Sequence, residues 1–466
     1  MDLHFSSLAD VAHRIESKKI SPVELTELML TRLGEQNPQY HAYTLVTDQQ
    51  AREAALAAEK EISAGGYKGT LHGVPIAIKD LFQTKGIATT CGSVVKRGWI
   101  PTEDATVVKK LKEAGAVILG KLNMTEFALS GYHPDLPVPV NPWGHDRWSG
   151  VSSSGSGVAT AAGMAFGTLG SDTGGSIRFP AAVNGVVGIK PTFGRVSKNG
   201  AFPLAYTLDH IGPIARTVED AAILLQAIAG YDANDPFSNR VPVTDYCEGL
   251  DSGIRGLRIG IDETYCATDA HPEVTAAVLS ASRTFEELGA HLVPVNMLSV
   301  LEVCPFWGAV VAAEAAVAHQ ELFPEQAEQY GPVFRSTLEA ALHISASDYA
   351  QARLAATNTK ATLENLLNEV DVLLCPGAPL PAMPLEEFPP TQILPPQAVA
   401  SFVGFTAPTN FSGHPTISVP CGFSADDLPL GLQLVGNYNA EANLITAAHT
   451  FEQATNWSTR KPPIDL

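Results

Sequence analysis

The 466-residue sequence predicts an α/β fold, because stretches with helical periodicity alternate with short apolar stretches typical of buried strands. Its composition is that of a globular protein, with 45% apolar and 17% charged residues. Two irregular stretches, residues 232–256 and 376–396, interrupt the alternation, and the strand pattern resumes after each of them. We therefore expect loops that leave one sheet rather than boundaries between domains.

The first elements follow from local signals. Apolar residues at helical spacing from Leu8 to Leu33 predict two surface helices, the second beginning at Ser21-Pro22, a typical N-cap and first-turn pair. Residues 51–62 are rich in Ala and Glu and precede two glycines, which predicts a helix and its end. The apolar run Val74–Ile78 then predicts a short strand that delivers Lys79.

The same alternation continues along the chain. Residues 104–114 predict a helix with an acidic first turn, and residues 116–119 predict the strand that follows it. Further expected strands are 258–261, 291–295, 371–374, 416–419 and 431–435, and further expected helices are 272–288, 347–370 and 439–453. The stretch 376–396 holds eight prolines, too many for a helix or a central strand.

Charge and cysteine usage exclude several classes of function. Thirty basic and 49 acidic residues give a net charge of −19, which disfavours binding to nucleic acid or to an acidic membrane surface. There is no apolar run of spanning length and no secretory signal at the N-terminus, so we expect a cytoplasmic protein. The six cysteines form no metal-binding spacing, which indicates reduced thiols.

Two loops rich in serine and glycine, Ser149–Gly157 and Gly170–Pro180, flank the apolar segment Val158–Leu169, which we expect to be a buried helix. A flexible linker does not fit this context, because the segment between the loops must be buried. Closely packed Gly/Ser loops leave backbone N–H groups free to hold an anion.

The anion site is not explained by a nucleotide or a metal. Residues 115–121 match the glycine and lysine spacing of a phosphate-binding loop, but Leu122 replaces the required Ser or Thr and the middle residues predict a strand. No dinucleotide motif and no zinc-protease motif occurs. We expect no cofactor and no metal.

Nucleophilic catalysis remains. Thr173, Gly174, Gly175 and Ser176 supply consecutive N–H groups beside one hydroxyl, which suits an oxyanion next to a nucleophile. A G-x-S-x-G motif is absent. His72 and His210 are the nearest histidine candidates for a base, although a lone histidine is more often structural. Lys79 is the other candidate, if burial keeps its amine neutral.

Three motifs follow one another along the chain: Gly73–Asp80, Ser152-Ser153-Ser154-Gly-Ser156 and Gly170–Arg178. Their order and spacing give the sequence a resemblance to the amidase signature family. The resemblance extends through Asn123–Phe127, Gly188–Pro191, Leu208–Pro213 and Gly431–Gly436. It implies a single α/β/α domain over residues 1–466, with a large mixed sheet covered by helices on both faces. The signature core would span about 70–220, and the half at about 250–466 would form the substrate funnel.

The resemblance also implies roles for individual residues. Ser176 resembles the nucleophile, Ser152 the bridging serine whose preceding peptide is cis, and Lys79 the general base. The oxyanion would rest on the N–H groups of residues 173–176. Asp172 and Arg178 resemble residues that orient the glycine-rich loop, although a plain structural ion pair is an equal alternative for Arg178. Ser153 is expected to touch the proton relay, and Tyr132 is a weaker candidate for substrate contact. The sequence departs from the common family loop at Val151 and Ser154.

The resulting expectation is an amidohydrolase of a small neutral or aryl amide, anilide or carbamate, with a small molecule as its substrate. Family members are often homodimers, which makes a homodimer one expectation. The main alternative is the glutamine-hydrolysing A subunit of a tRNA-dependent amidotransferase. A second alternative, an inactive amidase-like adaptor, is disfavoured because Lys79, Ser152 and Ser176 are all present.

Overall fold

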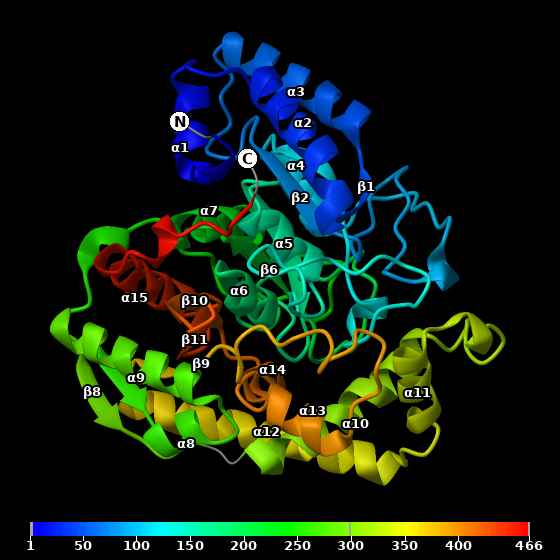
Figure 1. Ribbon diagram of the computed structural model, residues 1–466, viewed down its shortest axis with the longest axis vertical. Coiled ribbons are helices and arrows are strands. Elements are labelled where there is room, and N and C mark those ends of the chain that lie inside the picture. Colours follow the sequence, from blue (N-terminus) through cyan, green and yellow to red (C-terminus); the bar gives the residue numbers. More distant parts are fainter. Residues whose placement is uncertain (1–2, 298–299, 465–466) are drawn as a thin grey trace.

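The computed structural model describes residues 3–297 and 300–464, whose strands form one mixed sheet in the order β1-β3-β2-β4-β6-β5-β10-β11-β9-β7-β8 (Figure 1). The pairs β2–β3, β2–β4, β7–β8 and β7–β9 are parallel, and the remaining neighbours are antiparallel. The strands are β1 Tyr43–Val46, β2 Pro75–Lys79, β3 Val117–Leu122, β4 Gly167–Asp172, β5 Val187–Lys190, β6 His210–Ala215, β7 Arg258–Ile261, β8 His291–Pro294, β9 Val372–Pro376, β10 Thr416–Phe423 and β11 Pro429–Gly436. The predicted α/β class and mixed sheet are confirmed.

Helices connect these strands. They are α1 Leu8–Glu16, α2 Pro22–Tyr40, α3 Asp48–Ser63, α4 Thr106–Glu113, α5 Ser154–Ala161, α6 Arg178–Asn184, α7 Val218–Ile228, α8 Glu263–Ala267, α9 Pro272–Glu287, α10 Val300–Ala318, α11 Pro332–Ala341, α12 Ala346–Glu369, α13 Pro396–Val403, α14 Ala407–Ser412 and α15 Glu441–Ala454. No helix in the described residues is long and apolar enough to cross a membrane.

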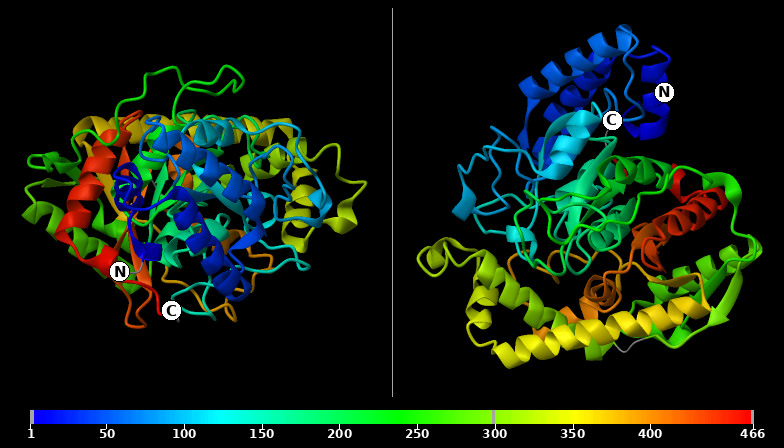
Figure 2. Two further views of the ribbon diagram at one scale, coloured as in Figure 1. Left: turned by 90° about the horizontal axis from the view of Figure 1, so that it is seen from above. Right: turned by 180° about the vertical axis from the view of Figure 1, so that it is seen from behind.

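Helices cover both faces of the sheet (Figure 2), and the contacts of alternate strand residues show which helices lie on which face. On β11, Gly431 faces Ala182 of α6, whereas Gly436 faces Leu444 of α15. Likewise β4 turns Gly167 towards Leu224 of α7 and Gly170 towards Ser153, next to α5. Successive strand residues point to opposite faces, so α5 and α6 lie on one side and α7 and α15 on the other.

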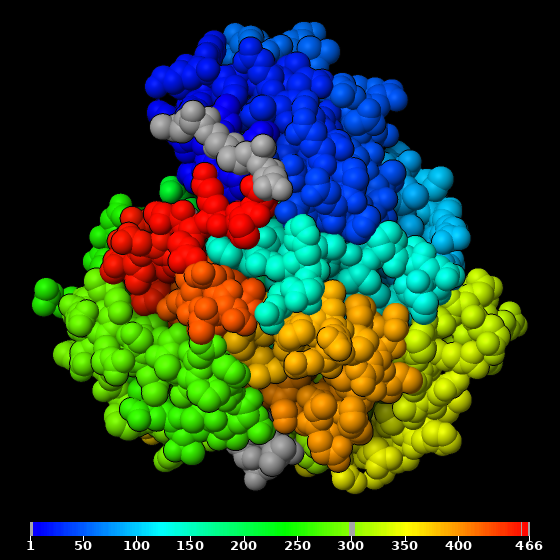
Figure 3. Space-filling model, in the orientation of Figure 1, coloured from blue at the N-terminus to red at the C-terminus, as the bar shows by residue number. Residues whose placement is uncertain are grey.

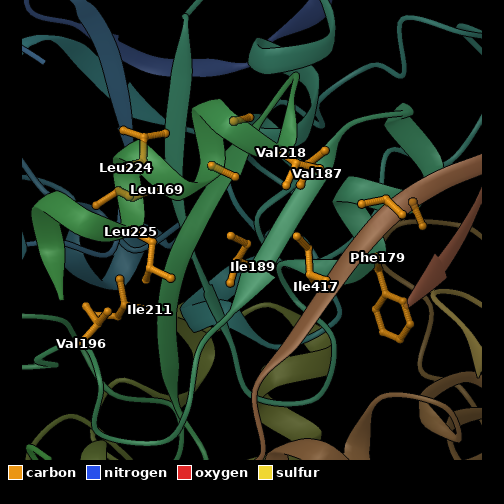
Figure 4. Close-up of a cluster of buried hydrophobic side chains, with 14 of the residues drawn as sticks. Leu169, Phe179, Val187, Ile189, Val196, Ile211, Val218, Leu224, Leu225 and Ile417 are labelled. Carbon is orange, nitrogen blue, oxygen red and sulfur yellow. The ribbon is translucent and has the colours of Figure 1, made fainter. Parts of the chain in front are cut away.

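The core is built mainly from aliphatic side chains of these layers (Figure 4). Leu169 of β4 and Ile211 of β6 lie with Leu224 and Leu225 of α7, and all four are at most 2% exposed. The two ends of the described chain also meet: Lys461 Nζ lies 4.5 Å from the ring centroid of Phe5.

Most expected elements are present. Ser21 caps α2 in a capping box with Glu24, as its serine-proline pair predicts. The run before Lys79 is the fully buried strand β2. The prediction of an acidic first turn for α4 is wrong. Asp104 precedes the helix and accepts from Lys85 N, and Ala105 is the N-cap.

The segment between the two serine loops is buried, but it is not one helix. Helix α5 ends at Ala161, and Gly167–Asp172 is strand β4, so the second predicted loop begins only at Thr173. The stretches 232–256 and 377–395 are largely irregular, and the strands on either side of them belong to the same sheet, as expected. The sequence does not predict strands β1, β4, β5 and β6 or helices α6, α7, α8, α10, α11, α13 and α14 as elements.

Candidate active site

The edge of the sheet where β2 and β4 end brings together the residues that the sequence singled out. The two strands are parallel, so their carboxyl ends lie at the same edge. Strand β2 ends at Lys79, and β4 carries Ser171 and ends at Asp172. The loop before α5 supplies Ser152 and Ser153.

Lys79 lies at the centre of a cluster of hydroxyls. Its Nζ is 2.7 Å from Ser152 Oγ, 2.9 Å from Ser153 Oγ and 2.8 Å from Ser171 Oγ. Ser153 Oγ also donates to Ser171 O, so its own proton is used and it accepts from the lysine. A neutral amine has two N–H protons for three partners, so one of the other hydroxyls must donate to its lone pair. The hydroxyls of Ser152 and Ser171, at 2.7 and 2.8 Å, are both placed to do so.

The electrostatics of the cluster favour this neutral form. Lys79 is 0% exposed, and burial lowers the pKa of its amine to about 7, against the opposing attraction of Asp172 and Asp209. The direct partners of Nζ are hydroxyls, which carry no charge to hold a proton on the amine. This is the direction that the sequence led us to expect for a buried lysine.

The serine loop is held close to helix α6. The peptide bond between Val151 and Ser152 is cis, as the resemblance implied. Gly150 has φ +83°, and a Cβ on it would lie 2.6 Å from Pro180 Cα, so only glycine fits this approach. Ser153 N donates to Ser176 O at 3.3 Å, which joins the two loops. Ser176 is 9% exposed and Ser152 is 0% exposed, so Ser176 is the more accessible of the two residues.

The loop that carries Ser176 offers backbone N–H groups but no free carbonyl. The carbonyls of residues 172 to 176 accept, in order, from Asn410 Nδ2, Trp307 Nε1, Thr406 Oγ1, Phe179 N and Ser153 N. The Gly175 N–H donates to Asp172 Oδ1 at 2.8 Å. No described residue accepts from the N–H groups of Thr173, Gly174 and Ser176. Buried amides without an acceptor suit an anion, and three of the four N–H groups expected to hold an oxyanion are open.

Asp172 and Arg178 form a buried pair that shapes this loop. Arg178 donates through Nε and Nη2 to the two carboxylate oxygens at 3.0 and 2.9 Å. Burial alone would raise the pKa of Asp172, but the guanidinium outweighs it and holds the pKa below the ordinary value. The same carboxylate accepts from the N–H groups of Gly175 and Ile177. The ion pair and the loop-orienting contacts are therefore both present.

Other predicted residues lie outside the cluster. His72 contacts Glu61 and the N–H of Lys68, away from the serines. His210 pairs with Asp172 across β6 and β4, and its Nδ1 lies 2.6 Å from Leu208 O. Neither has a described hydrogen bond to Lys79 or to the serine hydroxyls. Tyr132 is buried and donates to Ser154 Oγ at 2.6 Å, which supports the serine loop, and its contact with substrate stays a prediction.

An aromatic cluster lies against the Ser176 loop. Phe179 packs so close to Gly175 that a Cβ there would lie 2.4 Å from its ring. Its ring centroid is 4.7 Å from that of Phe402, which also packs with Trp148 and Phe388 at 5.0 and 5.8 Å. We call Trp148, Phe179, Phe388 and Phe402 the aromatic wall.

The proline-rich segment supplies part of this wall. Trp148 N donates to Met383 O, and Leu385 N donates to Asp146 O, so the segment packs on the chain before the serine loop. Figure 3 shows the proline-rich segment and the chain before the serine loop as adjoining orange and cyan surfaces.

Two kinds of site residue escaped the sequence analysis. Ser171 stands in a quoted motif, and the parallel ends of β2 and β4 place it beside Lys79. Thr406 and Asn410 carry no local signal of their contacts, and Trp307, one of several aromatic residues in the C-terminal half, carries no local signal of its hydrogen bond. Within the described ranges, no group of three or more His, Cys, Asp or Glu side chains is placed to hold a metal, and all six cysteines are free.

Comparison with known proteins matches these features to one family. The family model described as Amidase matches residues 24–445. The chain is 42% identical to the putative amidase AmiD of Mycobacterium tuberculosis, over 98% of this chain and 96% of that protein. It is 39% identical to the A subunit of glutamyl-tRNA(Gln) amidotransferase from a Geobacter species, over all of both chains. The crystal structure of a bacterial aryl acylamidase of the amidase signature family superposes with a TM-score of 0.89 at 28% identity, covering 98% of each chain.

Proposed function

The chain belongs to the amidase signature family of carbon–nitrogen hydrolases, and from that premise we propose that it cleaves a small neutral or aryl amide, anilide or carbamate through an acyl-enzyme on Ser176. The observation that carries this proposal is Lys79, fully buried among three hydroxyls with a pKa of about 7. A general base works best when its pKa lies near the working pH.

In the proposed reaction, neutral Lys79 takes the proton of Ser152 while Ser152 takes the proton of Ser176. The Ser176 oxygen attacks the amide carbonyl carbon, and the carbonyl oxygen becomes an oxyanion. The open N–H groups of Thr173, Gly174 and Ser176 hold this charge.

The relay then runs in reverse. The proton passes back through Ser152 to the leaving nitrogen, the C–N bond breaks, and the amine departs. Water, deprotonated by the same relay, attacks the acyl-enzyme and releases the carboxylic acid, which restores the Ser176 hydroxyl.

The aromatic wall supports a neutral, apolar or aryl group beside the reacting carbonyl. Phe179 is three residues from Ser176, and Phe388 and Phe402 are only partly buried, so part of the wall is open to solvent. The alternative, a glutamine-hydrolysing A subunit, needs the site to hold the charged amino-acid end of glutamine. An aromatic surface suits an aryl or alkyl group better.

The test is release of amine from an anilide, an aliphatic amide, a carbamate, an ester and glutamine. We expect turnover of the anilide or carbamate by the isolated chain, complete loss in Ser176→Ala, and unchanged turnover in Cys421→Ala as the matched control. Turnover of glutamine alone, or only with added partner subunits, would refute the proposal in favour of the amidotransferase alternative.

A further inference from the structure

The peptide units of the Ser176 loop are held by donors from the opposite half of the chain. Asn410, Trp307 and Thr406 bind the carbonyls of Asp172, Thr173 and Gly174 in succession. All three donors follow residue 300, whereas the loop lies at residues 172–176. The C-terminal half therefore holds in place a loop that belongs to the N-terminal half and carries the Ser176 hydroxyl.

One of these donors controls an open N–H group. In a trans peptide the C=O and the next N–H point in opposite directions within one plane. The Thr173 carbonyl accepts from Trp307 Nε1 at 2.9 Å, so this bond fixes the direction of the Gly174 N–H. Thr406 binds the Gly174 carbonyl and so fixes the direction of the Gly175 N–H, which already donates to Asp172.

The Thr173–Gly174 peptide needs such a constraint. Gly174 has no side chain to restrict rotation of the peptide units beside it. The Trp307 ring fills the space that a side chain would occupy, because a Cβ on Gly174 would lie 2.3 Å from its Cζ2. Trp307 is 9% exposed and lies on α10, so its ring supports the loop from outside the hydroxyl cluster.

We propose that Trp307 is a positioning residue that aims the Gly174 N–H at the developing oxyanion through its indole hydrogen bond to the Thr173 carbonyl. The inference rests on the proposed function, since it assigns the anion site to the transition state of that reaction. We expect loss of this hydrogen bond to lower kcat and to leave ground-state binding unchanged, because the substrate carbonyl oxygen gains its full charge only when Ser176 attacks.

Trp307→Phe tests the hydrogen bond while it keeps an aromatic ring. The matched control is Trp143→Phe, which removes an indole bond of the same kind, 2.8 Å to Asn184 O, at the far end of α6. For each protein we would measure kcat and KM on an anilide, the pH midpoint of kcat/KM, and the affinity of an aryl boronic acid. The boronic acid becomes a tetrahedral anion when the Ser176 oxygen adds to boron, so it reports the anion site directly.

For Trp307→Phe we expect kcat and boronic acid affinity to fall together by about tenfold, the loss of one well-aligned hydrogen bond. KM stays within about twofold, and the pH midpoint does not move, because the base is untouched. Trp143→Phe behaves as wild type. An unchanged kcat, a rise in KM alone, or an equal loss in Trp143→Phe would overturn the inference.

The outcomes separate this inference from the proposed function. If the wild-type chain cleaves no substrate in the panel, the proposed function fails. Boronic acid affinity, measured by calorimetry, then decides the inference alone: a tenfold loss in Trp307→Phe supports it, and equal affinities overturn it.

Discussion

Lowering the pH below about 7 is expected to stop turnover by protonating Lys79. A free lysine, with a pKa of 10.5, would be neutral in only about 0.03% of molecules at pH 7. With the pKa at about 7, about half are neutral at pH 7 and about 1% at pH 5. Burial thus raises the reactive fraction at neutral pH by about 10³, and kcat/KM should fall tenfold per pH unit on the acid side.

The assay is initial-rate release of aniline from an anilide between pH 5 and 9, analysed as kcat/KM so that it reports the free enzyme. Glu126 needs a control, because burial raises the pKa of its carboxyl to about 7 as well and Thr125 N donates to Ser152 O beside it. Glu126→Gln should keep the acid limb with the same midpoint. A flat profile, a midpoint above pH 9, or a limb that disappears in Glu126→Gln would refute the role of Lys79.

Three further substitutions test other parts of the site. Lys79→Met should abolish turnover and stabilise the fold by about 1–3 kcal/mol at pH 7. Burial lowers the pKa of Lys79 to about 7 in the folded state, below its value of 10.5 in the unfolded state, so the wild-type protein becomes more stable as the pH rises. The stability gain of Lys79→Met, measured by urea unfolding, should therefore shrink between pH 7 and 10. Arg178→Met leaves the Asp172 carboxylate buried without its partner and should cost about 3–5 kcal/mol of unfolding free energy; an unchanged urea midpoint would contradict this. Gly174→Ala should lower kcat by about tenfold or more, because its methyl group would displace the Trp307 ring or the loop; wild-type kinetics would show that the loop tolerates the shift.

The sequence predicts those parts of the site that local patterns specify. A continuous apolar run that ends in lysine indicates a buried strand with a basic residue at its end, and β2 is such a strand. The two Gly/Ser loops are also visible in the local composition of the sequence. In the first loop, glycine is needed at position 150 because the backbone there approaches Pro180 closely. The extent of the second loop is misjudged because Gly170–Asp172 has loop composition, and its pairing with β6 makes it a strand.

The rest of the site depends on contacts between distant parts of the chain. Trp307 and Thr406 meet their carbonyl acceptors across 134 and 232 residues of sequence, and nothing in their neighbouring residues signals it. Helix α10 is also hard to predict, because Pro305 and Gly308 interrupt a segment that is apolar on most sides. Strand β6 contains Gly212 and Pro213, residues that are depleted in strands.

These distant contacts bear on how the chain is organised. The N-terminal half supplies the proposed base, bridging hydroxyl and nucleophile, whereas the C-terminal half supplies the donors that bind the carbonyls of the Ser176 loop. Cutting the chain near residue 250 would separate β5 from β10 in one continuous sheet and remove the side-chain donors to three carbonyls of the loop. Each unpaired buried carbonyl costs about 1–3 kcal/mol, so the isolated N-terminal half would rearrange the loop. We therefore propose that residues 1–466 act as one domain, and that the N-terminal half alone has the reactive groups but not the anion site.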